Sequence, residues 1–301
     1  MPAHGSTLLG RRRREGSPSR TYNSRVPPEV SVVIPNYNRA AMVGAAVRSA
    51  LAQEEVEVEV IVCDDGSDDA SATVVRELAD RRVRWSPGER SGGPSRPRNR
   101  GVADARAPWV AFLDSDDIWY PSKLVTQLRL LEATQGVASS TNAYRCRPGA
   151  DLRPLLYPSL PPVVVLEDQL RGNLLVTSSV LVRTDVLRAL GGFPERAGRA
   201  LFEDYALWLR LVQEHPVHVV DHPLVDYRDD AATSLRGGLS SELLCTFNSL
   251  RDFRRWRAES HPPLRTTPRE WSLGARQLSG LVSVRSALAA RSRTMSSSGA
   301  T

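Results

Sequence analysis

The residues best suited to chemistry are three aspartates that follow a short apolar run. Trp109 to Leu113 is apolar and leads into Asp114, Asp116 and Asp117. A buried strand that ends in carboxylates places them at the rim of a sheet, where open α/β sheets bind ligands. Clustered carboxylates repel one another unless a cation lies between them, and oxygen ligands favour Mg²⁺ or Mn²⁺. The alternative is a solvated acidic loop that caps the helix after Pro121, and this stretch alone leaves both open.

A second acidic cluster follows another β-branched run. Val56 to Cys63 alternates Val and Glu and leads into Asp64 and Asp65. Gly66 permits a tight turn, and helix capping accounts for the polar residues from Ser67 onward. Capping does not account for two aspartates that precede the turn. A carboxylate at this place can accept a hydrogen bond from a base N–H or from a ribose hydroxyl.

Three more candidates lie elsewhere in the chain. Tyr37 follows the first apolar run and can stack on a base or cover the sheet edge. Arg98 falls on a helix expected over 95–105, and its planar guanidinium suits phosphate or base contacts. Glu203 and Asp204 open a strongly amphipathic helix, where the helix dipole alone would explain two acidic residues.

The elements that must position these residues alternate along the chain. β-Branched runs predict strands at 29–34, 56–63, 83–85, 109–113, 136–144, 177–183, 217–220 and 224–227. Helical composition and spacing predict helices at 40–52, 69–79, 95–105, 123–131 and 184–190, then from 203, from 240 and at about 268–290. Residues 163–170 fit a short helix or a strand. Such alternation predicts an α/β fold, and the lack of GxGxxG after the first strand argues against a dinucleotide fold.

Composition narrows the class of protein further. The chain has 301 residues, a net charge of +6 and 40 basic residues, of which only Lys123 is a lysine. We find no run near the roughly 18–20 apolar residues that a membrane span needs, no signal-peptide core and no nucleic-acid-binding motif. Cys63, Cys146 and Cys245 are few and far apart, which indicates a reducing compartment. We therefore expect a cytoplasmic protein, with peripheral contact at the inner membrane face as an alternative.

Six segments together resemble a known family. In order they read SVVIPNYNR, CDDGSDD, GGPSRPRNRGVADARAPWVAFLDSDDIW, TSSVLVR, GGFPE and FEDYALWLRL. This order is similar to that of the inverting family-two glycosyltransferases of the GT-A fold, over about Glu29 to Tyr227. The resemblance implies a Rossmann-like α/β fold: a mixed, mainly parallel sheet with helices on both faces and a C-terminal helical appendage. The expected domains are a disordered basic tail (1–27), a GT-A domain (28–235), a helical extension (236–292) and a disordered tail (293–301).

The resemblance also implies roles for the candidate residues on the donor side. A nucleoside pocket would be lined by Pro35, Tyr37, Asn38 and Asp65, with Asp65 on the base. Arg98 would reach the base or the diphosphate. Asp114-Ser115-Asp116 matches the DxD motif.

The remaining implied roles concern the cofactor and catalysis. Asp116 would ligate Mn²⁺ or Mg²⁺, and Asp114 would contact ribose or a metal-bound water. Asp204 matches the position of the general base. The sequence departs from the family at Tyr227-Arg228-Asp229-Asp230, where many relatives have a histidine at the last position. A diphosphate or metal contact from that loop is therefore open.

The activity implied is transfer of a sugar from a nucleotide-diphosphate sugar, with UDP preferred, to an acceptor hydroxyl. The acceptor class stays open among glycans, natural products, lipid-linked sugars and peptides. Two alternatives remain: a nucleotidyltransferase-like enzyme, and a catalytically silent module that binds nucleotide sugars. The first would need a Gly-rich loop after the first strand, where this chain has Asn36-Tyr37-Asn38. Expected partners are the donor, a hydroxyl-bearing acceptor and, through the C-terminal helices, a second copy of the chain.

Overall fold

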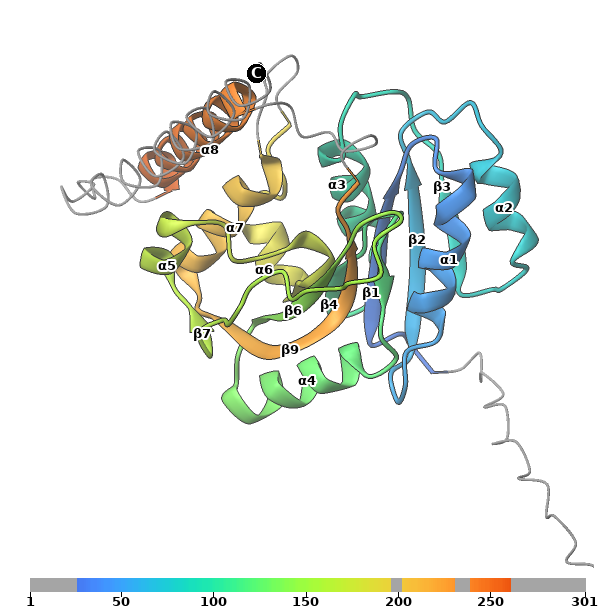
Figure 1. The fold of residues 1–301 in the computed structure, drawn as a ribbon, viewed down its shortest axis with the longest axis horizontal. Helices are drawn as coiled ribbons and strands as arrows, with labels where there is room; N and C mark the ends of the chain where they lie inside the picture. Colours follow the sequence, from blue (N-terminus) through green and yellow to red (C-terminus); the bar gives the residue numbers. More distant parts are fainter. Residues whose placement is uncertain (1–25, 196–201, 231–238, 261–301) are drawn as a thin grey trace, which may run out of the picture.

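The computed structural model describes residues 26–195, 202–230 and 239–260 of the chain. Within these residues, nine strands form one sheet in the order β3-β2-β1-β4-β8-β6-β9-β5, with β7 paired to β9 (Figure 1). The strands are β1 (Val30–Asn36), β2 (Val58–Asp64), β3 (Val83–Ser86), β4 (Trp109–Phe112), β5 (Ile118–Trp119), β6 (Ala138–Cys146), β7 (Val163–Val164), β8 (Leu181–Arg183) and β9 (Val217–Arg228). The α/β class expected from the sequence is confirmed.

The first half of the sheet is parallel. β1 pairs in parallel with β2 and with β4, and β2 pairs in parallel with β3. Every residue of β1 and β2 is buried, as expected for strands that are covered on both faces. Because parallel strands end at the same sheet edge, Asn36 at the end of β1 lies beside Asp64 at the end of β2.

Helices cover both faces of the sheet, as predicted. Side chains on one face, including Val32, pack with α1 (Ala40–Leu51), α2 (Ser71–Glu77) and α4 (Lys123–Thr134). Side chains on the other face, including Val33, pack with α3 (Ser95–Asp104), α6 (Thr184–Ala189) and α7 (Glu203–Glu214). Consecutive strand residues thus enter two different cores, since side chains alternate across a strand.

The second half of the sheet is mixed. β8 runs antiparallel to β4 and β6, and β9 runs parallel to β6. Two closing strands were predicted at 217–220 and 224–227, but the structure has one strand, β9, which bends strongly in Figure 1. Pro223 lies within it, opposite Asn142, where the register with β6 shifts. A register irregularity tolerates the missing proline N–H, so the strand continues through it.

Three shorter segments also differ from the prediction. The strand expected at 177–183 divides into a 3₁₀ turn, η1 (Thr177–Ser179), and β8. Residues 163–170, for which helix and strand both stayed open, form β7 and then α5 (Leu166–Arg171). β5 was not predicted, because two residues carry no periodicity.

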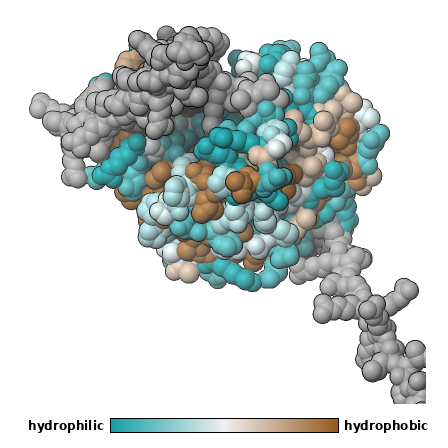
Figure 2. Space-filling model, in the orientation of Figure 1, coloured by the Kyte–Doolittle hydropathy of each residue, from teal (hydrophilic) through white to brown (hydrophobic). Residues whose placement is uncertain are grey.

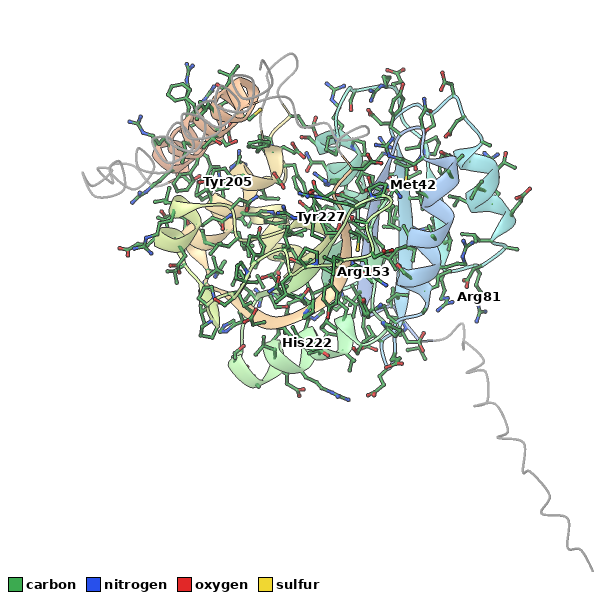
Figure 3. All side chains as sticks on the ribbon, in the orientation of Figure 1. Met42, Arg81, Arg153, Tyr205, His222 and Tyr227 are labelled. Atoms are coloured by element: carbon green, nitrogen blue, oxygen red, sulfur yellow. The ribbon has the colours of Figure 1, made fainter. Side chains whose placement is uncertain are left out.

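The last described element, α8 (Leu239–Ser260), packs on α7. Arg210 of α7 pairs with Asp252 of α8 at 2.6 Å, and Phe253 joins a small apolar cluster with Tyr205 and Leu209. Tyr205, labelled in Figure 3, donates its hydroxyl to the Gln169 carbonyl of α5 at 3.0 Å. The helix predicted at 268–290 and most of both predicted tails lie outside the described residues. None of the described helices has the length and apolar content to cross a membrane, and the visible face is largely hydrophilic (Figure 2).

Candidate functional site

The candidate site lies at the carboxyl ends of β1, β2 and β4. Asp64, at the end of β2, stabilises this edge of the sheet by accepting hydrogen bonds from neighbouring segments. Its two oxygens accept hydrogen bonds from Asn36 Nδ2 at 3.0 Å, from the Gly66 amide at 3.1 Å and from the Ser67 amide at 2.8 Å. Gly66 has a φ of +78°, which glycine adopts at little cost. Asp64 therefore fixes the turn after β2, and the neighbouring Asp65 has a different set of partners.

The DxD segment forms a tight turn. The amide of Asp117 donates to the Asp114 carbonyl oxygen at 3.1 Å, and Ser115 between them is buried. Asp117 is itself buried and accepts from Ser178 Oγ at 2.6 Å and from the Arg228 amide at 2.8 Å. Burial, with the charges of neighbouring aspartates, raises the pKa of Asp117. This third aspartate ties the turn to its surroundings.

Asp116 projects from the same turn. Burial and the charge of Asp114 raise the pKa of Asp116. The nearby groups therefore do not fully offset the negative charge of its ionised form. In the described part of the chain no other side chain donates a hydrogen bond to its carboxylate. A site of this kind fits a cation that takes one or two protein carboxylates and completes its shell with substrate phosphates, as Mg²⁺ does. Among the described residues there is no group of three or more His, Cys, Asp or Glu that could hold a metal.

Arg98 links the two acidic segments. Its guanidinium is almost fully buried and pairs with Asp114 at 2.7 Å on one side and with Glu203 at 2.7 Å on the other. The carboxylates keep the pKa of Arg98 above its usual range despite its burial. In the structure, Arg98 is thus paired with one carboxylate from the turn after β4 and one from α7. Its contact with a base or diphosphate stays a prediction.

Glu203 and Asp204 begin α7 and share this charged environment. Burial and the charge of Asp204 raise the pKa of Glu203 to about 7, against the opposing effect of Arg98. Asp204 accepts a hydrogen bond from Thr177 Oγ1 at 3.1 Å and one from the Tyr205 amide at 2.7 Å. Through Arg98 and Thr177 the structure brings Asp204 to the same site as the DxD turn, although the two are far apart in sequence.

The segment predicted to bind the nucleoside is filled by the chain's own loop. Asp65 is buried and accepts from the Ser91 amide at 2.9 Å, from Ser91 Oγ at 2.5 Å, from the Gly92 amide at 3.1 Å and from Arg90. The Arg90 guanidinium also lies 3.5 Å from the centre of the Tyr37 ring. The planar Arg90 guanidinium thus stacks on Tyr37 and donates to Asp65 at the same time. The two residues therefore lie close enough for one planar group, such as a nucleobase, to contact both.

The other sequence candidates have structural partners. Pro35 is buried at the end of β1. Asn38 has a φ of 50° and exchanges two hydrogen bonds with Asp68, at 2.7 and 3.0 Å. Asp229 pairs with Arg147 at 3.1 Å, and Asp230 pairs with Arg228 at 3.2 Å. Arg228, next to these two aspartates, contacts the DxD turn through its amide and Asp117, and a diphosphate or metal contact from Asp229 or Asp230 stays a prediction.

Sequence reasoning missed three residues of the site, Arg90, Thr177 and Ser178, and it also missed the pairing of Glu203 with Arg98. Thr177 and Ser178 were assigned to a strand, so no functional signal attached to them. Arg90 lies in a Gly/Pro-rich loop whose path no periodicity predicts. Nothing in the sequence indicated that Arg98 is buried, and it is burial that makes carboxylate partners necessary for an arginine.

Comparisons with known proteins bear on the family and the fold. The sequence model of the family Glycosyl transferase family 2 matches residues 31–183, about half of the chain. This segment contains β1, β2, β4 and the DxD turn. The chain therefore belongs to glycosyl transferase family 2.

Two relatives illustrate the range of similarity. The succinoglycan biosynthesis protein ExoO of Rhizobium meliloti is 43% identical over 106 residues, which cover 35% of this chain and 30% of that protein. An Escherichia coli protein named UDP-Glc:alpha-D-GlcNAc-diphosphoundecaprenol beta-1,3-glucosyltransferase WfaP is 30% identical over 186 residues, which cover 62% of this chain and 70% of that protein. The matched segment is about a third of the length of ExoO and of an uncharacterised Rickettsia conorii glycosyltransferase.

Solved structures show the same fold. TarS residues 1–349 from S. aureus, in complex with UDP-GlcNAc, superposes with a TM-score of 0.60 at 18% identity, covering 84% of this chain and 80% of that one. The mannosyltransferase PcManGT from Pyrobaculum calidifontis, in complex with GDP-Man and Mn²⁺, has a TM-score of 0.54 at 17% identity, covering 91% and 81%. The chain has the GT-A fold of these glycosyltransferases.

Proposed function

We propose that the protein is an inverting, metal-dependent glycosyltransferase that moves a sugar from a UDP-sugar to an acceptor hydroxyl. The observation that supports this proposal is that Arg98 pairs with Asp114 and Glu203, while η1 contacts Asp114 through Ser178 and Asp204 through Thr177. One pair of carboxylates lies on the turn after β4, and the other acid comes from α7. Membership of the family and the nucleotide sugars named for the structural neighbours support the donor class.

The proposed reaction is a single displacement. The acceptor oxygen forms a bond to the anomeric carbon while the bond from that carbon to the diphosphate oxygen breaks. Asp204 takes the acceptor proton, which makes it the general base, and the diphosphate leaves with the electron pair. A Mg²⁺ or Mn²⁺ ion at Asp116, when bound, would offset the charge of the diphosphate as a Lewis acid. Inversion at the anomeric carbon follows from a single attack on the face opposite the leaving group.

On the donor side, we propose that the base stacks on Tyr37 and donates to Asp65, at the positions that Arg90 fills. Pro35 and Asn38 would shape this pocket from the end of β1. Asp114, held by Arg98, would face the ribose or a metal-bound water. For the acceptor we propose a lipid-linked sugar, supported by two Escherichia coli relatives whose names give a diphosphoundecaprenol-linked sugar as their acceptor.

The test is incubation of the purified chain with a panel of UDP-, GDP- and dTDP-sugars, with Mn²⁺ or with EDTA, scored by released nucleotide. We expect metal-dependent release from a UDP-sugar and, once an acceptor is found, a product of inverted anomeric configuration by NMR. Release that is equal with EDTA would reject metal dependence. A retained anomeric configuration would reject single displacement, and failure to bind any nucleotide sugar would reject the proposal.

A further inference from the structure

The 3₁₀ turn η1 connects the two halves of the site. All three of its residues are buried. Consecutive residues of this turn contact elements that are distant in sequence: Thr177 contacts α7, and Ser178 contacts the turn after β4. η1 in turn leads directly into β8, which pairs with β4. Its position is therefore fixed by the sheet.

Ser178 holds the DxD turn from both ends. Its Oγ accepts a hydrogen bond from the Asp114 amide at 3.0 Å and donates to Asp117 Oδ2 at 2.6 Å. Its carbonyl oxygen accepts from Trp119 Nε1 at 2.7 Å. One hydroxyl thus uses its donor and its acceptor capacity on the first and last residues of the turn. The direction in which Asp114 and Asp116 project depends on this arrangement.

Thr177 holds the acid across the site. Its Oγ1 donates to Asp204 Oδ2 at 3.1 Å, while Asp204 Oδ1 accepts from the Tyr205 amide at 2.7 Å. Each carboxylate oxygen therefore has one protein donor, and the plane of the carboxylate is defined. Each oxygen keeps acceptor capacity for another hydrogen, since a carboxylate oxygen has two lone pairs.

We propose that η1 is a positioning element for the reaction, with a separate task for each of two neighbouring hydroxyls. Thr177 orients Asp204 toward the acceptor, and Ser178 orients the donor turn. This inference rests on the proposed function, in which Asp204 accepts the proton. It assigns to Thr177 an effect on turnover, because misplacement of a reacting group by about 1 Å is costly in rate. It assigns to Ser178 an effect on donor binding, because Ser178 holds the turn proposed to bind the donor.

Four substitutions separate these tasks. Thr177→Val replaces the hydroxyl with a methyl group of similar size, and Thr177→Ser keeps the hydroxyl. Ser178→Ala removes the hydroxyl that holds the DxD turn. Ser179→Ala is the matched control, because the Ser179 hydroxyl donates only within the turn, to the Val176 carbonyl at 2.7 Å.

The measurement is kcat and donor KM for each variant, with donor affinity from calorimetry as a check on folding. We expect Thr177→Val to lower kcat by about 10- to 100-fold, since a hydrogen bond to a charged group is lost, with donor affinity within about twofold of the wild type. Thr177→Ser should restore kcat to within about threefold. Ser178→Ala should instead raise donor KM by about 10-fold, and Ser179→Ala should change neither parameter.

Three results would overturn the inference. The first is a wild-type kcat in Thr177→Val. The second is a Thr177→Ser variant as slow as Thr177→Val, which would mean that shape and not the hydroxyl matters. The third is the same loss in all the variants, including Ser179→Ala, which is the behaviour of a turn that only stabilises the fold. Asp204→Asn separates this failure from that of the proposed function: full turnover in that variant would reject the base itself.

Discussion

At the scale of single residues, the site depends on one buried cation between two acids. Arg98 is 5% exposed, and each of its two ion pairs measures 2.7 Å. Removal of one partner from a buried charge network leaves the other charges uncompensated, which costs far more than the loss of a surface pair. The planar fork of arginine can face two carboxylates at once, which the point charge of lysine does not reproduce.

We predict that Arg98→Met lowers the free energy of unfolding by about 3 to 5 kcal/mol, because Asp114 and Glu203 are left facing each other. The matched control is Arg183→Met, since Arg183 pairs with Asp185 at 2.7 Å but is 46% exposed. That variant should lose less than about 1 kcal/mol. Urea unfolding of both variants measures the difference. Equal losses would show that Arg98 is an ordinary surface-like arginine.

A second residue-scale prediction concerns pH. Glu203 has a pKa of about 7 in the folded chain, against its usual 4.5. Between these values the folded state binds more protons than the unfolded state, so Glu203 makes stability fall as pH rises through this window. Glu203→Gln removes that titration. The free energy of unfolding of the wild type, relative to the variant, should therefore decrease by up to about 3 kcal/mol from pH 4.5 to pH 8.

Urea titrations of both proteins at several pH values provide the measurement. The comparison cancels the titrating groups that do not interact with Glu203, whereas Asp204 and Arg98, which do interact with it, contribute to the measured difference. A relative stability that is constant or that rises with pH would show that the pKa of Glu203 is not raised in the folded chain.

At the scale of elements, the loop between β3 and α3 stands where a base is proposed to bind. Arg90 stacks on Tyr37 and pairs with Asp65, so a base that uses those residues must displace it. We predict that Arg90→Ala tightens UDP binding by about 3- to 10-fold, because the competing guanidinium is removed. The control is Arg96→Ala, since Arg96 is 63% exposed and pairs only weakly, with Glu195 at 3.3 Å.

Calorimetric titration with UDP and Mn²⁺ decides between two arrangements. Weaker binding in Arg90→Ala than in Arg96→Ala would mean that Arg90 stays and contacts the nucleotide. In that case the loop is part of the binding site and does not compete with it.

The sequence predicts the elements best where periodicity is strong. The buried runs that become β1, β2 and β4 and the amphipathic helices α4 and α7 were found with small shifts in their ends. The sequence predicts a strand where η1 lies, because residue types alone do not reveal that the first three residues of 177–183 make the hydrogen bonds of a 3₁₀ turn. β9 was divided in two at Pro223, because a bulge that tolerates proline depends on the partner strand.

At the scale of the whole molecule, the site depends on close packing between α3 and the parallel sheet. A Cβ added at Gly101 would lie 2.4 Å from Val33 Cγ1 and 3.0 Å from Cys63 Sγ. α3 carries Arg98, so this contact also sets the position of the central cation. The two cores on either side of the sheet share β1, and a shift of α3 would be transmitted to it.

We predict that Gly101→Ala lowers the free energy of unfolding by about 1 to 3 kcal/mol, since extra volume in a packed core forces displacement. Gly172→Ala is the control, because a Cβ at that position meets no atom within 4 Å. Thermal and urea unfolding of both variants supply the test. A Gly101→Ala variant as stable as the control would show that α3 moves without cost.

The sequence predicts most of the candidate residues but not the contacts that hold them together. Asp114, Asp116 and Asp204 were identified as candidates from strand ends, from a helix start and from family resemblance. The ion pairs of Arg98 and the hydrogen bonds from Thr177 and Ser178 depend on contacts between distant segments. No spacing within the sequence encodes those contacts, so only the three-dimensional structure shows how the acids are held.

The most direct test compares Asp116→Ala and Asp204→Asn in parallel, by titration with the donor in Mn²⁺ and by assay of product formation. We predict that Asp116→Ala loses metal-dependent donor binding, whereas Asp204→Asn binds the donor as the wild type does and forms no product. Unchanged metal-dependent binding in Asp116→Ala, or full turnover in Asp204→Asn, would contradict the account.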